Sequence, residues 1–103
     1  MVVIGFTGEF KKRTSKYLVD SYRYLPCKEI KDIGKWLEKD YDVVMYFESP
    51  EDAECIRHLF GGIIISVSRE VYPPGGFSSD YHVSVSGTEY EFYTHIDNIM
   101  AEL

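Results

Sequence analysis

Short apolar runs alternate along this chain with segments of helical periodicity, and this alternation constrains the fold more than any other feature. The runs occupy residues 2–6, 42–47, 63–67 and 81–86. The second run, Asp-Val-Val-Met-Tyr-Phe, is nearly continuous in apolar character, which is typical of strands buried on both faces of a parallel sheet. Strands that are separated by helices need crossover connections, which place helices on both faces. We therefore predict a single domain over residues 1–103, a three-layer α/β sandwich with four mainly parallel strands.

Four helices are predicted between and after these strands. The first begins near Thr14 and ends before Pro26, because proline cannot continue a helix. The second covers residues 27–39, where apolar residues recur at helical spacing. The third follows Ser49, whose side chain suits an N-cap, and the last begins near Thr88. No apolar run reaches the length of a membrane span, so no membrane association is expected.

The first apolar run leads into a glycine turn and then into a basic helix start. A strand, a turn and a helix in this order are the context in which the motif G-x-x-x-x-G-K-[ST] binds phosphates. When the motif is aligned on Gly8, its second glycine becomes Arg13 and its lysine becomes Thr14. Only the terminal hydroxyl, on Ser15, keeps its type. The pattern fits either a degenerate phosphate loop or a chance strand–turn–helix.

Several segments together resemble the bacteriophage-type deoxynucleoside monophosphate kinases, which are P-loop kinases. Residues 4–8, Ile-Gly-Phe-Thr-Gly, are similar to the opening strand and loop of that family. Residues 42–54 resemble its next strand and acidic helix start, and residues 61–69 resemble the Gly-Gly strand that follows. Residues 82–84, His-Val-Ser, and the Gly-Thr-Glu start of the last helix resemble its C-terminal end.

The resemblance implies a P-loop-kinase-like arrangement of the sheet. The strand at 2–6 is expected between those at 42–47 and 63–67, with the strand at 81–86 at the far edge. The former phosphate site then lies at the carboxyl ends of the strands.

The positions that carry chemistry in that family differ here. Thr14 stands at the P-loop lysine, and Val85 stands where an acid is expected. The Asp-x-Arg pair of the family falls on Tyr46 and Glu48. The long middle portion that holds the monophosphate-binding segment and the lid is missing, because only residues 15–39 separate the first loop from the second strand. Phosphoryl transfer depends on positioning and charge stabilisation, so we predict that the chain is not an enzyme and assign no catalytic residue.

Two interpretations of the basic turn remain open. Cations are unfavourable at a helix N-terminus, and a bound anion would relieve that cost. The turn either still binds an anion, such as a nucleotide or another phosphate-bearing ligand, or is a solvated basic turn. The candidate residues for such a site are Gly8, Lys11, Lys12, Arg13, Thr14 and Ser15.

Charge is unevenly divided along the chain, whose formal net charge is −6. Residues 11–39 carry +5, whereas residues 40–103 carry −10. This division suits an anionic partner on one side and a cationic partner on the other, and the acidic surfaces disfavour nucleic acid. The nine tyrosines suit a protein interface, although half-buried positions over the sheet explain many of them equally well. The candidate interaction surface consists of Glu51, Asp52, Glu54, Tyr72 and Tyr90.

The leading hypothesis is a non-catalytic, kinase-derived protein that acts by binding another protein. On the resemblance alone, it is phage-encoded and inhibits a host protein. The alternative is nucleotide binding, or residual deoxynucleoside monophosphate kinase activity, at the degenerate loop.

Neither a cofactor nor a metal site is predicted. Cys27 and Cys55 lack metal-type spacing and indicate reduced thiols in the cytoplasm, that of the host if the protein is phage-encoded. Ser84 and Ser86 lie beside His82 in sequence, but no acid that would orient the imidazole is evident.

Overall fold

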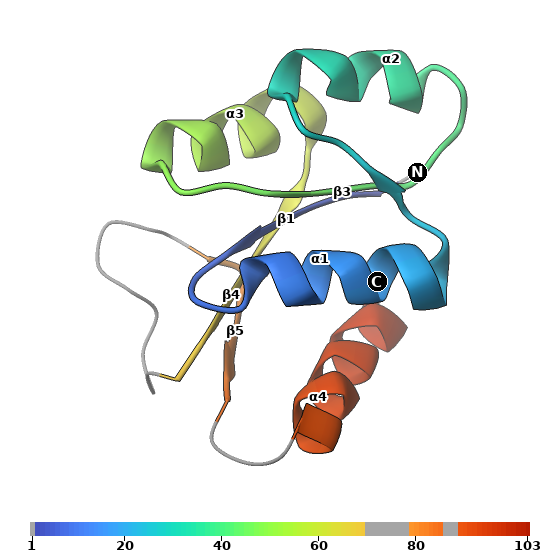
Figure 1. Ribbon diagram of the computed structural model, residues 1–103. Helices are drawn as coiled ribbons and strands as arrows, with labels where there is room; N and C mark the ends of the chain where they lie inside the picture. The colour runs from blue at the N-terminus through green and yellow to red at the C-terminus, as the bar shows by residue number, and fades with distance from the viewer. Residues whose placement is uncertain (1, 70–78, 86–88) are drawn as a thin grey trace.

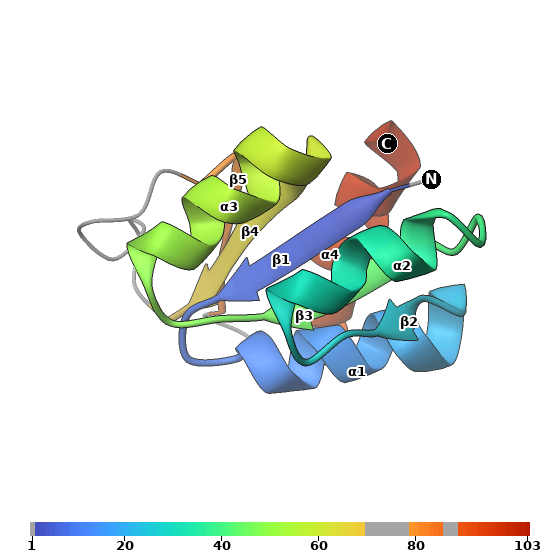
Figure 2. The ribbon, with the colours of Figure 1, turned by 90° about the horizontal axis from the view of Figure 1, so that it is seen from above.

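A parallel β-sheet with helices on both faces forms the framework of this computed structural model (Figures 1 and 2). The structure describes residues 2–69, 79–85 and 89–103, without the side chains of residues 89 and 90. Its strands are β1 (Val3–Thr7), β2 (Leu25–Pro26), β3 (Val43–Tyr46), β4 (Ile63–Ser68) and β5 (Tyr81–Ser84). Its helices are α1 (Lys11–Tyr22), α2 (Ile33–Leu37), α3 (Pro50–Phe60) and α4 (Glu89–Glu102), and one 3-10 turn, η1 (Ile30–Asp32), precedes α2.

The sheet order is β2-β3-β1-β4-β5, and all of these strands run parallel. The predicted placement of the 2–6 strand between the 42–47 and 63–67 strands, with the 81–86 strand at the far edge, is confirmed. Every residue of β1 is buried, as expected for the central strand of a sheet covered on both faces.

Each face of the sheet has its own hydrophobic core, and two helices cover each face (Figure 1). On one face, α1 and α4 pack against alternate residues of the central strands through Leu18, Phe92 and Ile96. On the other face, α2 and α3 contribute Ile33 and Ile56. The prediction of helices on both faces is therefore confirmed, and the two cores follow from the alternation of side chains along each strand.

The fifth strand, β2, is a correction to the four strands predicted from the sequence. α1 ends before Pro26, at Tyr22, where the cap residue Arg23 takes a left-handed conformation. The chain then stays extended alongside β3. The backbone amide of Leu25 donates to the carbonyl of Asp42 at 2.8 Å, and that of Cys27 donates to the carbonyl of Val44 at 2.9 Å. Proline has no amide proton to donate, which an edge strand tolerates. Because these residues are extended, the helix predicted over 27–39 is shortened to η1 and α2.

The ends of α1 and α4 are joined by tyrosine contacts around one carboxylate. The hydroxyls of Tyr17 and Tyr22 each donate to Oδ1 of Asp97 at 2.7 Å. The rings of Tyr17 and Tyr93 stack with centroids 4.3 Å apart. The hydrogen bond to Asp97, together with burial, raises the pKa of Tyr17. Burial and the same carboxylate raise the pKa of Tyr22 to about 12.

No helix among the described residues is long and apolar enough to cross a membrane.

Alkaline pH is expected to destabilise the protein through this cluster. As the pH rises from 10.0 to about 12, Tyr22 loses its proton in the unfolded chain but keeps it in the folded chain. The free energy of unfolding therefore falls over this range. Below pH 10.0, Tyr22 is protonated in both states and its contribution to stability is constant. Urea unfolding across that pH range measures the decline. Asp97→Asn is expected to make the decline shallower, whereas Asp20→Asn, which removes an exposed charge from α1, is expected to leave it unchanged. An equal decline in the wild type and in Asp97→Asn would contradict this account.

Candidate functional site

The sheet has a topological switch point between β1 and β3. The connection that follows β1 passes through α1 on one face, whereas the connection that follows β3 passes through α3 on the other face. In open parallel sheets, ligands bind in the crevice outside the carboxyl ends of two such strands. The residues that follow Thr7 and Tyr46 therefore form the first candidate site.

The turn after β1 packs against the backbone of β4. Gly8 has a φ of 100°, and a Cβ atom on it would lie 2.3 Å from the carbonyl oxygen of Val67, so only glycine fits. The amide of Phe10 donates to the same carbonyl at 3.2 Å, and the amide of Lys11 donates to the carbonyl of Gly8 at 3.3 Å. With the turn fixed in this way, α1 begins at Lys11 and not near Thr14, which corrects the predicted helix start. Only residues 8–10 separate β1 from α1.

Two hydroxyls that the motif alignment placed at the phosphate site lie on the buried side of α1. Thr14 is fully buried, and its Oγ1 donates to the carbonyl of Phe10 at 2.9 Å. Ser15 is also buried, and its Oγ donates to the carbonyl of Lys11 at 2.8 Å. Both hydroxyl protons are thus used within the helix, in the i to i−4 pattern common for serine and threonine.

An ion pair spans the switch point. Nζ of Lys11 lies 2.8 Å from Oε1 of Glu48, which follows β3. The lysine side chain is 17% exposed and the glutamate side chain 83% exposed. The hydrogen bond from Lys11 and its positive charge lower the pKa of Glu48. Next to this pair, Nζ of Lys12 lies 5.9 Å from the ring centroid of Tyr46. Tyr46 and Glu48 are the positions at which the resemblance implies an Asp-x-Arg pair.

Two guanidinium groups lie beside the ring of Phe10 in the same turn. Cζ of Arg13 is 6.0 Å from the ring centroid, and Cζ of Arg69 is 5.6 Å from it. Oε1 of Glu9 accepts a hydrogen bond from the amide of Arg69 at 3.4 Å. Arg13, which stands at the second glycine of the motif, therefore lies on the outside of the turn and is exposed.

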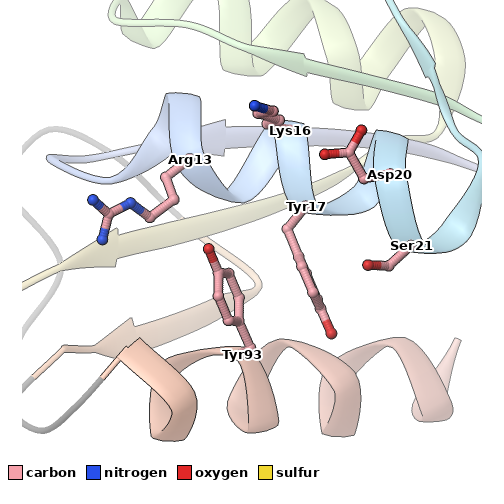
Figure 3. Close-up of a pocket in the computed structure, with 6 residues that line it drawn as sticks. All are labelled: Arg13, Lys16, Tyr17, Asp20, Ser21 and Tyr93. Carbon is pink, nitrogen blue, oxygen red and sulfur yellow. The ribbon is translucent and has the colours of Figure 1, made fainter.

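Cavities flank α1 on both sides. One of about 410 Å³ lies between α1 and α4 and is lined by Arg13, Lys16, Tyr17, Asp20, Ser21 and Tyr93 (Figure 3). Figure 3 shows Tyr17 and Tyr93 extending toward each other between the two helices. A second cavity, of about 350 Å³, lies between α1 and the β2–β3 side of the sheet and is lined by Lys12, Ser15, Lys16, Val19, Asp20, Pro26 and Tyr46. Lys16 and Asp20 line both cavities. We call the exposed residues Lys12, Arg13, Lys16, Asp20 and Arg23 the α1 ridge.

The acidic residues of the predicted interaction surface lie on α3, on the opposite face of the sheet. Ser49 caps this helix, and its Oγ accepts from the amide of Asp52 at 3.3 Å. Glu51 and Asp52 occupy the first turn, where negative charge stabilises a helix. Glu54 is exposed and lies 2.7 Å from Nε2 of His58. The other two predicted residues, Tyr72 and the side chain of Tyr90, lie outside the described residues.

A row of polar side chains crosses β1, β4 and β5. Thr7 is in register with Ser66, and Ser66 is in register with His82, so the three lie side by side on the α3 face. Ser66 is fully buried, and its Oγ has no hydrogen-bond partner among the described residues. Ser66 was missed in the sequence, although the alternation of Ser66 and Ser68 with apolar residues in β4 is the signal that places both on one face. No cluster of metal-binding side chains occurs among the described residues.

Comparison with protein-family models, with curated proteins and with solved structures gives no match.

Removal of the unpartnered hydroxyl is expected to stabilise the protein. Ser66→Ala deletes a buried polar atom that forms no hydrogen bond, so the free energy of unfolding is expected to rise by about 1 kcal/mol. Ser68→Ala is the matched control on the same face, because Ser68 has an interaction partner, and its loss is expected to destabilise. Urea unfolding measures both changes. A loss of stability in Ser66→Ala equal to that in Ser68→Ala would show that the Ser66 hydroxyl is satisfied.

Restoring the motif lysine is expected to unfold the turn and not to restore anion binding. Thr14→Lys places an ammonium at a fully buried position, which should cost about 3 kcal/mol or more. Thr14→Val removes only the hydroxyl and should cost about 1 kcal/mol. Thermal unfolding separates the two variants. A Thr14→Lys protein as stable as the wild type would mean that residue 14 can reach the outside of the turn.

Proposed function

We propose that this chain is a non-catalytic binding protein on a P-loop-kinase-like framework, and that it acts by contact with another protein. The observation that carries the proposal is the Lys11–Glu48 ion pair at the switch point. A kinase needs a cation there to stabilise the charge of the transferring phosphoryl group. In this chain, the lysine nearest the crevice is neutralised by the chain's own carboxylate.

The strand order supports the framework. The order β3-β1-β4-β5 is the one that the resemblance to P-loop kinases implies, and β2 adds an edge strand beyond β3. A fold does not determine a function, so activity is argued from the site alone.

The hydrogen bonds formed at the motif positions, Thr14 and Ser15, support the absence of catalysis. The hydroxyls of Thr14 and Ser15 are bonded inside α1, and the turn that precedes them contains only residues 8–10. A phosphate cradle needs several backbone amides directed at one anion, and here the amides of Phe10 and Lys11 donate to backbone carbonyls.

The exposed side of α1 supports a protein partner. The α1 ridge lies between two cavities, next to Tyr46, which is 46% exposed, and Tyr22, which is 36% exposed. Tyrosine and arginine are the side chains most enriched among the energetically important residues of protein interfaces. In its finer form, which rests on the resemblance alone, the proposal adds a phage origin and a host protein as the target.

A second candidate function is nucleotide binding in the 350 Å³ cavity. The exposed ring of Tyr46 would stack on a base, and Lys12 and Lys16 would bind phosphates. Lys12 already lies over the Tyr46 ring, which favours this candidate over binding at the turn itself.

A kinase assay and calorimetry test both candidates. With ATP and either dGMP or dTMP, we expect no ADP formation above buffer at high protein concentration, and no saturable heat with any of these nucleotides. ADP formation in proportion to protein would overturn the proposal. Saturable heat that Tyr46→Ala abolishes, and that Tyr41→Ala at another exposed tyrosine does not, would establish nucleotide binding in its place.

A further inference from the structure

We propose that the α1 ridge binds a short acidic segment of a protein partner, with an apolar side chain of that segment in the 350 Å³ cavity. The inference rests on the proposed function and names the chemistry of its partner. It is carried by the charges of the ridge, the composition of the two cavities and the length of the ridge.

Three of the four cations of the ridge lie outside the ion pairs of the described residues. α1 has no acidic residue in its first turn and no side-chain cap, so Lys12 faces the positive end of the helix dipole. The ion pairs of the described residues do not include Lys12, Lys16 or Arg23. Asp20 is the one acid within α1. An anionic partner would therefore relieve repulsion that the folded chain leaves in place.

The two cavities differ in chemistry and so define the partner further. The cavity beside α4 has walls of mixed character, in which Arg13, Lys16, Asp20 and Ser21 bring polar groups beside the two tyrosine rings (Figure 3). The cavity beside the sheet includes Val19, Pro26 and the Tyr46 ring below the ammonium groups of the ridge. A segment that binds here would place carboxylates on the ridge and insert an aliphatic or aromatic side chain beside Pro26.

The length of the ridge favours a short peptide over a nucleic acid. From Lys12 to Arg23 the helix rises by about 16 Å, which an extended segment of about five residues spans. One turn of a DNA duplex is about 34 Å long. A duplex would extend beyond the ridge toward a chain that carries −10 over residues 40–103. Acidic side chains already lie near both ends of α1, at Glu48 and Asp97.

The test uses a defined peptide and matched charge reversals. The probe is a fluorescein-labelled heptapeptide of four glutamates around a central Leu-Phe-Leu, with a version in which glutamine replaces every glutamate as its control. We expect anisotropy to show salt-sensitive binding of the acidic peptide by the wild type, and about tenfold weaker binding by the double variant Lys12→Glu/Lys16→Glu. Lys28→Glu/Lys31→Glu makes the same change in net charge at two exposed lysines outside the ridge and is expected to bind within about twofold of the wild type. Circular dichroism confirms that each variant is folded.

Absence of saturable binding of the acidic peptide by the wild type would overturn the inference, and so would three further results. One is equal binding of the glutamine peptide, and another is an equal loss in both double variants, which would indicate only net charge. The third is displacement of the peptide by a DNA duplex at concentrations below that of the peptide itself. The kinase assay is independent of these results: ADP formation would end the proposed function, whereas a failed peptide titration without ADP formation would end only this inference.

Discussion

The close contact between the turn at Gly8 and the backbone of β4 determines how the rest of the site is built. Because a side chain at Gly8 would clash with the carbonyl of Val67, the turn lies directly against the neighbouring strand. The amide of Phe10 then bonds to that carbonyl, and α1 begins at Lys11. From this start follow the burial of the hydroxyl at residue 14 and the position of Lys11 beside Glu48. In a P-loop, a glycine at this place lets a phosphate approach the backbone closely. Here Gly8 lets the backbone of β4 approach instead.

Different sides of α1 have different surroundings. The side that faces the sheet contributes Leu18 to the core, and the side that faces α4 carries Tyr17 and Tyr22, whose hydroxyls donate to Asp97. The outer side carries the α1 ridge, of which Arg13 lies beside the ring of Phe10. Lys12 and Lys16 are exposed, so changes at these two lysines should leave the tertiary structure intact.

The sequence predicts the sheet well and the site poorly, for physical reasons that individual residues illustrate. The apolar runs and the helices between them predict a parallel sheet covered on both faces, and the resemblance to P-loop kinases supplies the strand order. β2 was missed because two residues that include a proline have no periodicity. The start of α1 depends on the backbone hydrogen bond from Phe10 to Val67. The charge at the crevice depends on the ion pair between Lys11 and Glu48. Such contacts join residues that are far apart in sequence, so no local pattern reports them.

The cations of the basic turn differ in their surroundings. Lys11 pairs with Glu48, which follows β3. Lys12 and Lys16 instead lie on the exposed side of α1, and Lys12 is in its first turn, at the positive end of the dipole, where local rules of helix design oppose a cation. Departures from such rules without compensation inside the chain concentrate at functional surfaces. Among the described residues, the chain thus pairs Lys11 with Glu48 and leaves Lys12 and Lys16 exposed and outside any ion pair.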